Sequence, residues 1–339
     1  MTTLSRRKFL AAATAATAFA AEPKIRIAML GTGHAHAAGK LKTIQDSPDF
    51  ELAGVCEPKT RPDYKNVSWL TEEQLFNDPT IKAVAVEGTV PENLAYGQRV
   101  IASGKHLHID KPPTHRMEPF RALIEEARRK KLAAQCGYIW RFHAGFDHAL
   151  EAAKQGWLGD AYMVRAVINT DIPDSGRLAL SEFKGGMMFE LGCHMIDRVV
   201  ALWGRPKDVK KWLHHDSVIR DTLADNTLAV LEYGGSLAEI STSAKMAGAS
   251  PHRSFELIGS DGSIILAPVE PGTKMRVSMR EARGPYKKGW QDVDLPPQPR
   301  YIADFKDLAH FIRSGEPLKY SYDHELAVHE TLLRASGEI

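Results

Sequence analysis

The first 140 residues alternate between short apolar runs and helix-like segments, and this alternation constrains the fold more than any other feature. The apolar runs, read as strands, occupy 24–30, 50–56, 81–86, 105–109 and 132–138. Segments read as helices lie between them, at 35–44, 93–103 and 119–131. Successive strands joined through helices run parallel, so the pattern predicts an α/β Rossmann domain whose parallel sheet has helices on both faces.

The first strand–helix turn carries the signature of a dinucleotide site. Gly31-Thr32-Gly33-His34 follows the strand directly, and His36 stands where such a turn has its third glycine. The first glycine permits the turn, the second lets a pyrophosphate approach the backbone, and the helix N-terminus supplies N–H groups. The third glycine normally allows close helix–strand packing, so we expect His36 to loosen that contact or to turn outward.

Glu57 closes the second strand, 26 residues after Gly31. A carboxylate there accepts hydrogen bonds from ribose hydroxyls and repels a 2′-phosphate, which favours NAD over NADP as cofactor. The alternative is a surface acid in the turn before Pro58. His34 and His36 also form a His-x-His pair, but the sequence offers no further ligand cluster, so no metal site is expected.

Beyond residue 140 the alternation stops. Helices are predicted at 144–155, 187–203, 301–314 and 324–335, and strands at 161–170, 209–213, 226–233, 236–242, 254–258, 263–266 and 274–279. Turns such as Gly234-Gly235 and Asp261-Gly262 join neighbouring strands, which indicates a mostly antiparallel sheet. We therefore predict a Rossmann domain over 22–140 and an α+β substrate and oligomerisation domain over 141–339. Its last helices should pack back on the first domain, and 285–300 should form a long exposed loop.

The segment 184–197 concentrates residues suited to proton transfer. If it is helical, Glu190, His194 and Asp197 stand at i, i+4 and i+7 and project from one face. Gly185 and Gly186 upstream allow a tight turn. An imidazole between two acids suits proton transfer near pH 7. The alternative is an amphipathic helix with one histidine in its core.

The N-terminus predicts export. Arg6-Arg7-Lys8 precedes a short, weakly apolar run that ends in Ala18-Phe19-Ala20, which is typical of a twin-arginine-like signal peptide over 1–20 and of a periplasmic or secreted protein. The run is too short to span a membrane. Its removal would change the formal charge from +2 to −1, and a near-neutral surface gives no case for nucleic acid as a partner. Three widely spaced cysteines argue against a disulfide framework.

Three motifs occur in the order that characterises one family. They are Gly31-Thr32-Gly33, then Asp110-Lys111-Pro112 after the fourth strand, then the run from Gly186 to Asp197. In this order and separation the chain resembles the glucose–fructose oxidoreductase / inositol dehydrogenase (Gfo/Idh/MocA) family over almost all of residues 22–339. It departs from the family pattern in having Asp110 for Glu, Glu190 for Asp, and Asn93 near a usual histidine.

The resemblance implies roles for the motif residues. Lys111 would lie near the nicotinamide and the substrate hydroxyl, His194 would be its acid/base partner, and Glu190 would bind and orient substrate. Asp110 and Pro112 would complete the cofactor edge, with Pro112 shaping the turn, through a cis bond or without one. We expect burial beside the nicotinamide to lower the pKa of Lys111 toward that of a working base. The family also implies a homo-oligomer, a dimer or tetramer.

Polar residues at the junction of the two domains are candidates for substrate contacts. They are Tyr138, Arg141, His143, Asn169 and Asp171, with Asp197 from the motif.

The main prediction is an NAD-dependent oxidoreductase of a sugar, polyol or related cyclic alcohol, with acid–base chemistry at Lys111 and His194. An alternative is redox-neutral, NAD-dependent cleavage of a glycoside by transient oxidation and elimination. A third is a non-catalytic nucleotide-binding module.

Overall fold

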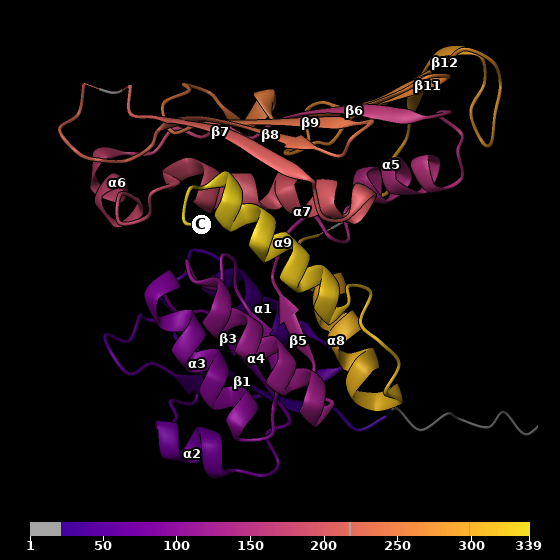
Figure 1. Cartoon of the computed structure of the whole chain (residues 1–339). Coiled ribbons are helices and arrows are strands. Elements are labelled where there is room, and N and C mark those ends of the chain that lie inside the picture. The colour runs from indigo at the N-terminus through magenta and orange to yellow at the C-terminus, as the bar shows by residue number, and fades with distance from the viewer. Residues whose placement is uncertain (1–21, 217, 298) are drawn as a thin grey trace, which may run out of the picture.

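The computed structural model describes residues 22–216, 218–297 and 299–339, so the predicted signal peptide lies outside the described residues. Two sheets form separate layers, and helices fill the space between them (Figure 1). The fold therefore has the predicted plan, an α/β Rossmann domain followed by an α+β domain. None of the described helices is long and apolar enough to cross a membrane.

The first sheet is five-stranded and parallel, in the order β2-β1-β3-β4-β5. Its strands are β1 (Ile25–Leu30), β2 (Phe50–Cys56), β3 (Ala83–Val86), β4 (His106–Ile109) and β5 (Ala134–Cys136). Its helices are α1 (Ala37–Asp46), α2 (Glu72–Asn77), α3 (Val90–Ala102) and α4 (Met117–Lys130).

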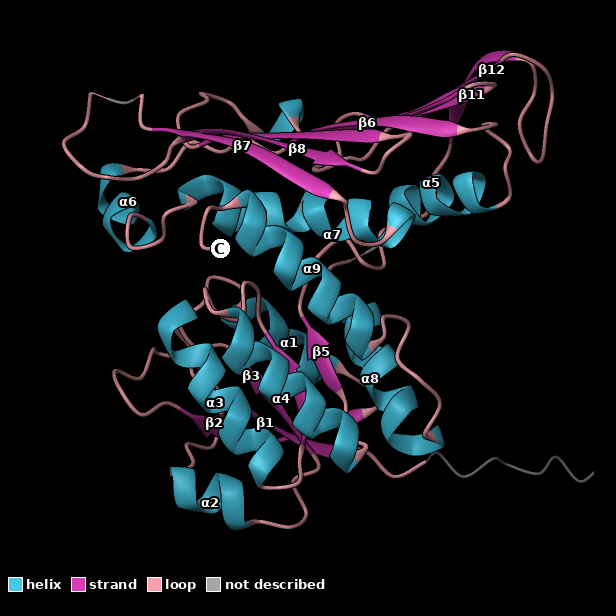
Figure 2. Ribbon diagram, viewed as in Figure 1, coloured by secondary structure: helices cyan, strands magenta, loops and turns pink. Residues whose placement is uncertain are grey.

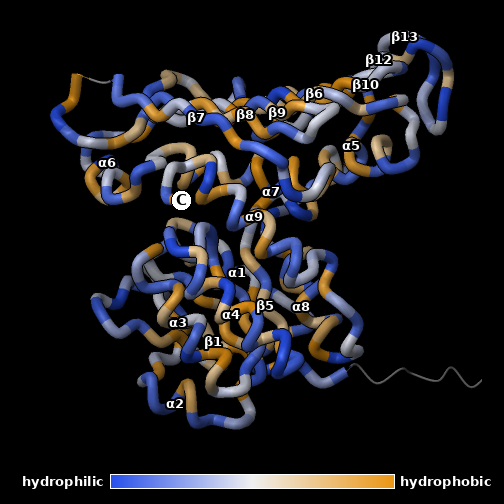
Figure 3. Tube along the Cα trace, viewed as in Figure 1, coloured by the Kyte–Doolittle hydropathy of each residue, from blue (hydrophilic) through white to orange (hydrophobic). Residues whose placement is uncertain are grey.

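Apolar side chains cover both faces of this sheet, as a parallel sheet requires. Along β1, Ala28 and Leu30 belong to the cluster that includes α3 and α4, whereas Ile27 and Met29 face the cluster of α1 and α8 (Ile302–Ser314). Figure 2 shows these helices on opposite sides of the strands, and Figure 3 shows hydrophobic segments in the helices and in the strands. The central strands β1 and β3 thus consist almost entirely of buried apolar residues, because helices cover both of their faces.

The second sheet has eight strands in the order β13-β12-β11-β10-β6-β9-β8-β7, and only the β6–β9 pair is parallel among those described. Its strands are β6 (Ala161–Val167), β7 (Asp208–His214), β8 (Asn226–Glu232), β9 (Leu237–Ser243), β10 (Ser254–Gly259), β11 (Gly262–Leu266), β12 (Met275–Met279) and β13 (Gly289–Val293). One face packs on α5 (Ala144–Lys154) and α7 (Cys193–Trp203). The opposite face exposes Trp212, Leu237 and Trp290; the homo-oligomer stays a prediction.

The prediction of a loop over 285–300 is wrong in part. Residues 289–293 form β13, which pairs antiparallel with β12 at the edge of the second sheet. The segment has one strand neighbour and alternates exposed and half-buried residues, so it lacks the apolar run that marks a buried strand. The short helices α2 and α6 (Asp174–Leu180) were also not expected, since each buries only one side chain.

The last two helices return to the first sheet. Phe305 of α8 packs edge-on against Phe50 of β2, with ring centroids 5.9 Å apart. In α9 (Tyr322–Ala335), Glu325 accepts a hydrogen bond from the backbone N–H of Cys136 in β5, at 3.1 Å. α9 also contacts α7 and α4, and in Figure 1 it crosses from one layer to the other. This helix therefore connects the two domains through contacts with β5, α4 and α7.

Candidate active site

The β1–α1 turn is built for close approach of a ligand to the backbone. Gly31 has φ +79°, and a Cβ there would lie 2.8 Å from the backbone of Gly88. A Cβ on Gly33 would lie 2.8 Å from the methyl group of Thr89. At the start of α1 the N–H groups of His36 and Ala37 donate to His34. No side chain caps those that follow, and an anion would bind there. These features fit the diphosphate of a dinucleotide.

Glu57 lies beside this turn, immediately after β2. Thr32 donates its hydroxyl to Glu57 Oε2 at 2.7 Å, and the backbone N–H of Lys59 donates to Oε1 at 2.8 Å. Both contacts fix the carboxylate at the end of the strand next to β1, where a ribose would approach it. The Lys59 contact is also one that an acid in a turn makes, so the alternative of a surface acid in the turn before Pro58 stays open.

A buried cluster of charges lies beneath the turn. Lys40 of α1 contacts Asp110 Oδ2 at 2.6 Å and Glu87 Oε1 at 2.8 Å, and all three side chains are fully buried. Burial alone would raise the pKa of Asp110, but Lys40 and the neighbouring histidines hold it well below its ordinary value. Burial raises the pKa of Glu87. The cluster explains why a lysine sits on the apolar face of α1.

His34 and His36 both turn toward Asp110. Their Nδ1 atoms lie 3.2 and 3.1 Å from Asp110 Oδ2, and the candidate ligand atoms of the three residues lie within 4.8 Å of one another. The Lys40 ammonium is bound to the same carboxylate oxygen, so it already supplies the positive charge that a metal would bring. His36 turns toward the fully buried Asp110 and toward Tyr301 rather than outward to solvent.

Lys111 follows β4 and reaches across to the second domain. Its Nζ lies 2.9 Å from Glu190 Oε1 and 3.0 Å from the Glu190 carbonyl oxygen. The Lys111–Pro112 peptide bond is cis. Glu190 belongs to a π-helical turn, η1 (Met188–Gly192), that leads into α7. Such turns add a residue to the helical repeat and are frequent at functional sites.

The π-helical turn corrects the prediction of one continuous helical face. Glu190 points to Lys111, whereas Asp197, on the regular part of α7, joins Arg141 and Arg198. The extra residue in η1 rotates the first acid relative to the second. Of the three polar residues Glu190, His194 and Asp197, only the first two therefore lie near Lys111.

The expected lowering of the Lys111 pKa is also wrong for the protein alone. Burial does favour the neutral amine, but the carboxylate of Glu190 outweighs it and raises the pKa of Lys111 above its ordinary value. The side chain is an ammonium at neutral pH. It is therefore suited to donate a hydrogen bond and to stabilise negative charge on a substrate oxygen.

His194 has the complementary character. The ring is buried among aromatic neighbours, with its centroid 5.5 Å from that of Trp140, 6.1 Å from Tyr138 and 6.5 Å from His36. Burial and the charge of Lys111 hold the pKa of His194 well below its ordinary value. Its Nδ1 has no hydrogen-bond partner among the described residues. A neutral imidazole beside an ammonium is an acceptor and a donor in one site.

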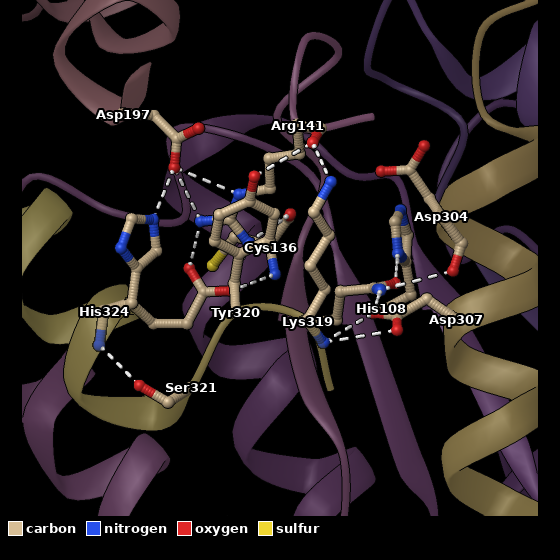
Figure 4. Close-up of polar contacts among 12 residues, drawn as sticks. His108, Cys136, Arg141, Asp197, Asp304, Asp307, Lys319, Tyr320, Ser321 and His324 are labelled. Atoms are coloured by element: carbon tan, nitrogen blue, oxygen red, sulfur yellow. Dashed lines mark hydrogen bonds and ion pairs between the residues drawn. The ribbon is translucent and has the colours of Figure 1, made fainter. Parts of the chain in front are cut away.

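Arg141 and Asp197 lie behind this site in a buried network, drawn in Figure 4. Arg141 contacts Asp197 Oδ1 at 2.9 Å and Glu325 at 2.5 Å, and His324 Nε2 lies 3.1 Å from Asp197 Oδ1. The network joins β5, α7 and α9. The charged atoms of Arg141 and Asp197 are engaged within the protein. These two candidate substrate residues therefore hold β5, α7 and α9 together behind the site.

Of the remaining candidates, Asn169, Asp171 and His143 lie at one end of the second sheet, whereas Tyr138 follows β5 of the first sheet. Asn169 donates its side-chain amide toward Met246 Sδ at 3.0 Å, and Asp171, exposed, pairs with Lys245 through the backbone. His143 caps α5: its Nδ1 accepts from the Gly145 N–H, and Nε2 lies 2.9 Å from Thr273 Oγ1. Tyr138 is buried against His194. Their contacts with substrate stay a prediction.

Four residues of this region were not found from the sequence. They are Lys40, Glu87, Tyr301 and Glu325. A lysine on an otherwise apolar helix face (Ala37, Leu41, Ile44) was the one available signal, because a buried lysine needs an acid nearby. Glu325 gave no such signal, since its partner Arg141 is 184 positions away.

Two family models match the two domains. The oxidoreductase family with NAD-binding Rossmann fold matches residues 25–138, and the GFO/IDH/MocA C-terminal domain matches residues 146–265. The chain belongs to the GFO/IDH/MocA family of oxidoreductases.

Individual relatives are distant. Myo-inositol 2-dehydrogenase of Thermotoga maritima is 23% identical over 312 residues, which cover 86% of this chain and 88% of that one. A scyllo-inositol 2-dehydrogenase (NADP(+)) of Bacillus subtilis is 25% identical over 80% of this chain and 76% of its own. Among solved structures, GenD2 from gentamicin A biosynthesis, in complex with NAD, superimposes with a TM-score of 0.78 at 20% identity, over 94% of this chain and 95% of that one. The structural likeness supports the fold.

Proposed function

We propose that the protein oxidises a secondary alcohol of a sugar, polyol or cyclic alcohol with a nicotinamide cofactor. One observation carries the proposal: Lys111, from the nucleotide-binding domain, meets Glu190 and His194, from the second domain, beside the β1–α1 glycine turn. Two inositol dehydrogenases among the relatives act on cyclic polyols, which supports this substrate class.

The protein's part of the reaction is to remove and hold a proton. Lys111, as an ammonium, would donate a hydrogen bond to the reacting hydroxyl oxygen and stabilise the alkoxide. His194, as a neutral imidazole, would take the proton. Glu190 would keep Lys111 charged and aimed. The cofactor, when bound, supplies the nicotinamide carbon that accepts the hydride from the substrate carbon bearing the reacting hydroxyl.

We propose NAD rather than NADP as that cofactor. The Glu57 carboxylate, held by Thr32 and by the Lys59 N–H, would accept hydrogen bonds from the ribose hydroxyls and would repel a 2′-phosphate. One relative uses NADP(+), so a titration of both nucleotides is the direct test.

A second reaction, cleavage of a glycoside without net redox change, is favoured by one observation. His36 places another imidazole near His194, and burial lowers its pKa to about 4, so both rings are neutral. Oxidation of a hydroxyl to a ketone would acidify the C–H bond on the neighbouring carbon. One of the two imidazoles would remove that proton, and the aglycone would leave as the double bond forms. Water would then add to the double bond, and return of the hydride would restore the alcohol and the oxidised cofactor.

Purified protein with NAD and a panel of sugars, polyols and aryl glycosides separates the two reactions. Accumulation of NADH with an oxidised sugar is the expected result. Release of the aglycone without NADH would instead support cleavage. Neither change with any compound, at saturating nucleotide, would contradict both and leave a nucleotide-binding module.

We also propose that the chain is exported folded, since its first 20 residues have the composition of a twin-arginine-like signal. Replacement of both Arg6 and Arg7 by Lys should retain the protein in the cytoplasmic fraction of a producing bacterium. Unchanged export of that variant would contradict a twin-arginine route.

A further inference from the structure

A cavity of about 730 Å³ opens at one end of the second sheet, and neither the acid–base site nor the cofactor turn uses it. Its walls come from the start of α5, the residues before β10, the β11–β12 connection and the segment before α8. Cavities of a few hundred to a thousand cubic ångströms are typical of small-ligand sites. The question is what chemistry its walls favour.

The cavity lies at the same end of the sheet as the candidate substrate residues. β10 runs antiparallel to β6, so the beginning of β10 adjoins the end of β6, where Asn169 follows. Arg253, directly before β10, donates its Nε to the Asn169 carbonyl oxygen at 3.2 Å. The motif is also near this end, because a Cβ on Gly192 would lie 3.5 Å from the side chain of Thr242 in β9.

A second route connects the cavity with the cofactor turn. Arg300 lines the cavity, and the next residue, Tyr301, packs on His36 with ring centroids 5.6 Å apart. His36 in turn lies 6.5 Å from His194, between ring centroids. A substrate whose reacting ring sits at His194 would therefore extend its remaining part toward Arg300 and Arg253.

The charged groups of the cavity are unbalanced. Three basic side chains, Arg253, Lys274 and Arg300, line it together with one acid, Glu270. Glu270 is paired with Arg300. His143 adds no further positive charge, because burial lowers its pKa and both ring nitrogens are engaged within the protein. The walls thus carry an excess of positive charge.

Arg253 has donors left over. Apart from its Nε contact, the part of the chain that the structure describes places no carboxylate within 4.0 Å of its guanidinium and no acceptor on its two terminal nitrogens. The side chain is half-buried, and burial together with Arg300 works to lower its pKa although Glu270 opposes them. A desolvated guanidinium with free N–H groups in a fixed plane is suited to a carboxylate.

We propose that this cavity binds the carboxylate of an acidic sugar, a uronic acid or a glycoside of one, with Arg253 as the residue that recognises the anion. The proposal deepens the proposed function and rests on it for the reaction, but not for the binding. The cavity would hold the acidic part of the substrate while Lys111 and His194 act on a hydroxyl.

The test compares matched ligands on matched variants loaded with NAD. Calorimetric titration and KM are measured for a glucuronide and for the neutral glucoside with the same aglycone. The variants are Arg253→Gln, Arg253→Lys and, as control, Arg165→Gln, which removes an exposed arginine of β6. A charge-assisted hydrogen bond contributes about 1.5–3 kcal/mol, so the wild type should bind the glucuronide roughly 10- to 100-fold better than the glucoside.

Arg253→Gln should lose this preference, Arg253→Lys should keep part of it, and Arg165→Gln should keep all of it. Equal affinity of the wild type for the two ligands, or an unchanged preference in Arg253→Gln, would overturn the anionic site. A glucuronide that binds through Arg253 without any oxidation or cleavage would support the site and contradict the proposed function. Equal oxidation of neutral and acidic sugars would support the proposed function and contradict the anionic site.

Discussion

Lys111 Nζ lies 2.9 Å from Glu190 Oε1, although 79 positions separate the two residues. The pair joins the two domains and keeps the lysine charged, because Glu190 more than offsets the cost of burying it. The two groups would therefore have different roles: the Lys111 ammonium stabilises negative charge on the substrate oxygen, and the His194 imidazole accepts the proton.

Replacement of Lys111 by Met should reduce kcat by about 10²- to 10⁴-fold, the usual contribution of a positioned acid or base. NAD affinity should change little, since the β1–α1 turn is untouched. Stopped-flow kinetics and nucleotide titration measure the two effects. Lys42→Met, which alters an exposed lysine of α1, is the control. Full activity of Lys111→Met would contradict its role.

The pH profile should report His194. Its pKa is held well below the ordinary value of about 6.5, so the imidazole is already deprotonated at neutral pH and kcat/KM should fall only on the acid side. Lys111, with its pKa raised, should contribute no alkaline limb below about pH 10. His194→Asn should lose most of the rate and the acid limb together. An acid limb that persists unchanged in this variant would assign it to another group.

Glu57→Gln should weaken NAD binding by about 10-fold or more and narrow the difference between NAD and NADP, because the carboxylate loses its charge while its shape is kept. Tryptophan fluorescence titration with each nucleotide measures this. Glu51→Gln, at an exposed position of β2, the strand that Glu57 follows, should leave both affinities unchanged. A wild type that prefers NADP would contradict the assignment of Glu57.

Asp197→Asn should destabilise the fold by about 3–5 kcal/mol, because it leaves Arg141 and Arg198 buried without their shared carboxylate. Burial alone would raise the pKa of Asp197, but the two arginines hold it well below its ordinary value. The stabilisation is therefore fully present above the unfolded-state pKa of about 4 and is lost progressively as pH falls from there through the lower folded-state pKa. Urea unfolding at pH 7 and pH 3 measures both effects.

Asp46→Asn, at an exposed position of α1, is the matched control for these unfolding experiments. Its free energy of unfolding should stay within about 0.5 kcal/mol of the wild type. If Asp197→Asn unfolded like this control at pH 7, the buried network would not be what holds α7 against α9.

Much of the fold was predictable because the signals are local. The apolar runs of β1 and β3 are almost entirely buried, and they stand out against the helices between the strands. β13 was missed because an edge strand with Trp290 and Asp292 exposed carries no apolar run. The π-helical turn was missed because its five residues have the same composition as an ordinary helical turn.

The site was predictable where a motif names it and hidden where it depends on contacts distant in sequence. Lys111, Glu190 and His194 were expected together, and the structure brings them together. The direction of the Lys111 pKa was not, because it depends on how closely Glu190 approaches. Arg141 and Asp197 were assigned to substrate because sequence gives no sign of Glu325, their distant partner in α9.

The most direct test of the account is a crystal structure of the protein with NAD and a bound polyol or sugar acid. The account predicts that the nicotinamide lies over the β1–α1 turn and that the reacting hydroxyl is within about 3 Å of both Lys111 Nζ and a ring nitrogen of His194. A nicotinamide bound away from Lys111, or a substrate hydroxyl that meets neither side chain, would contradict it.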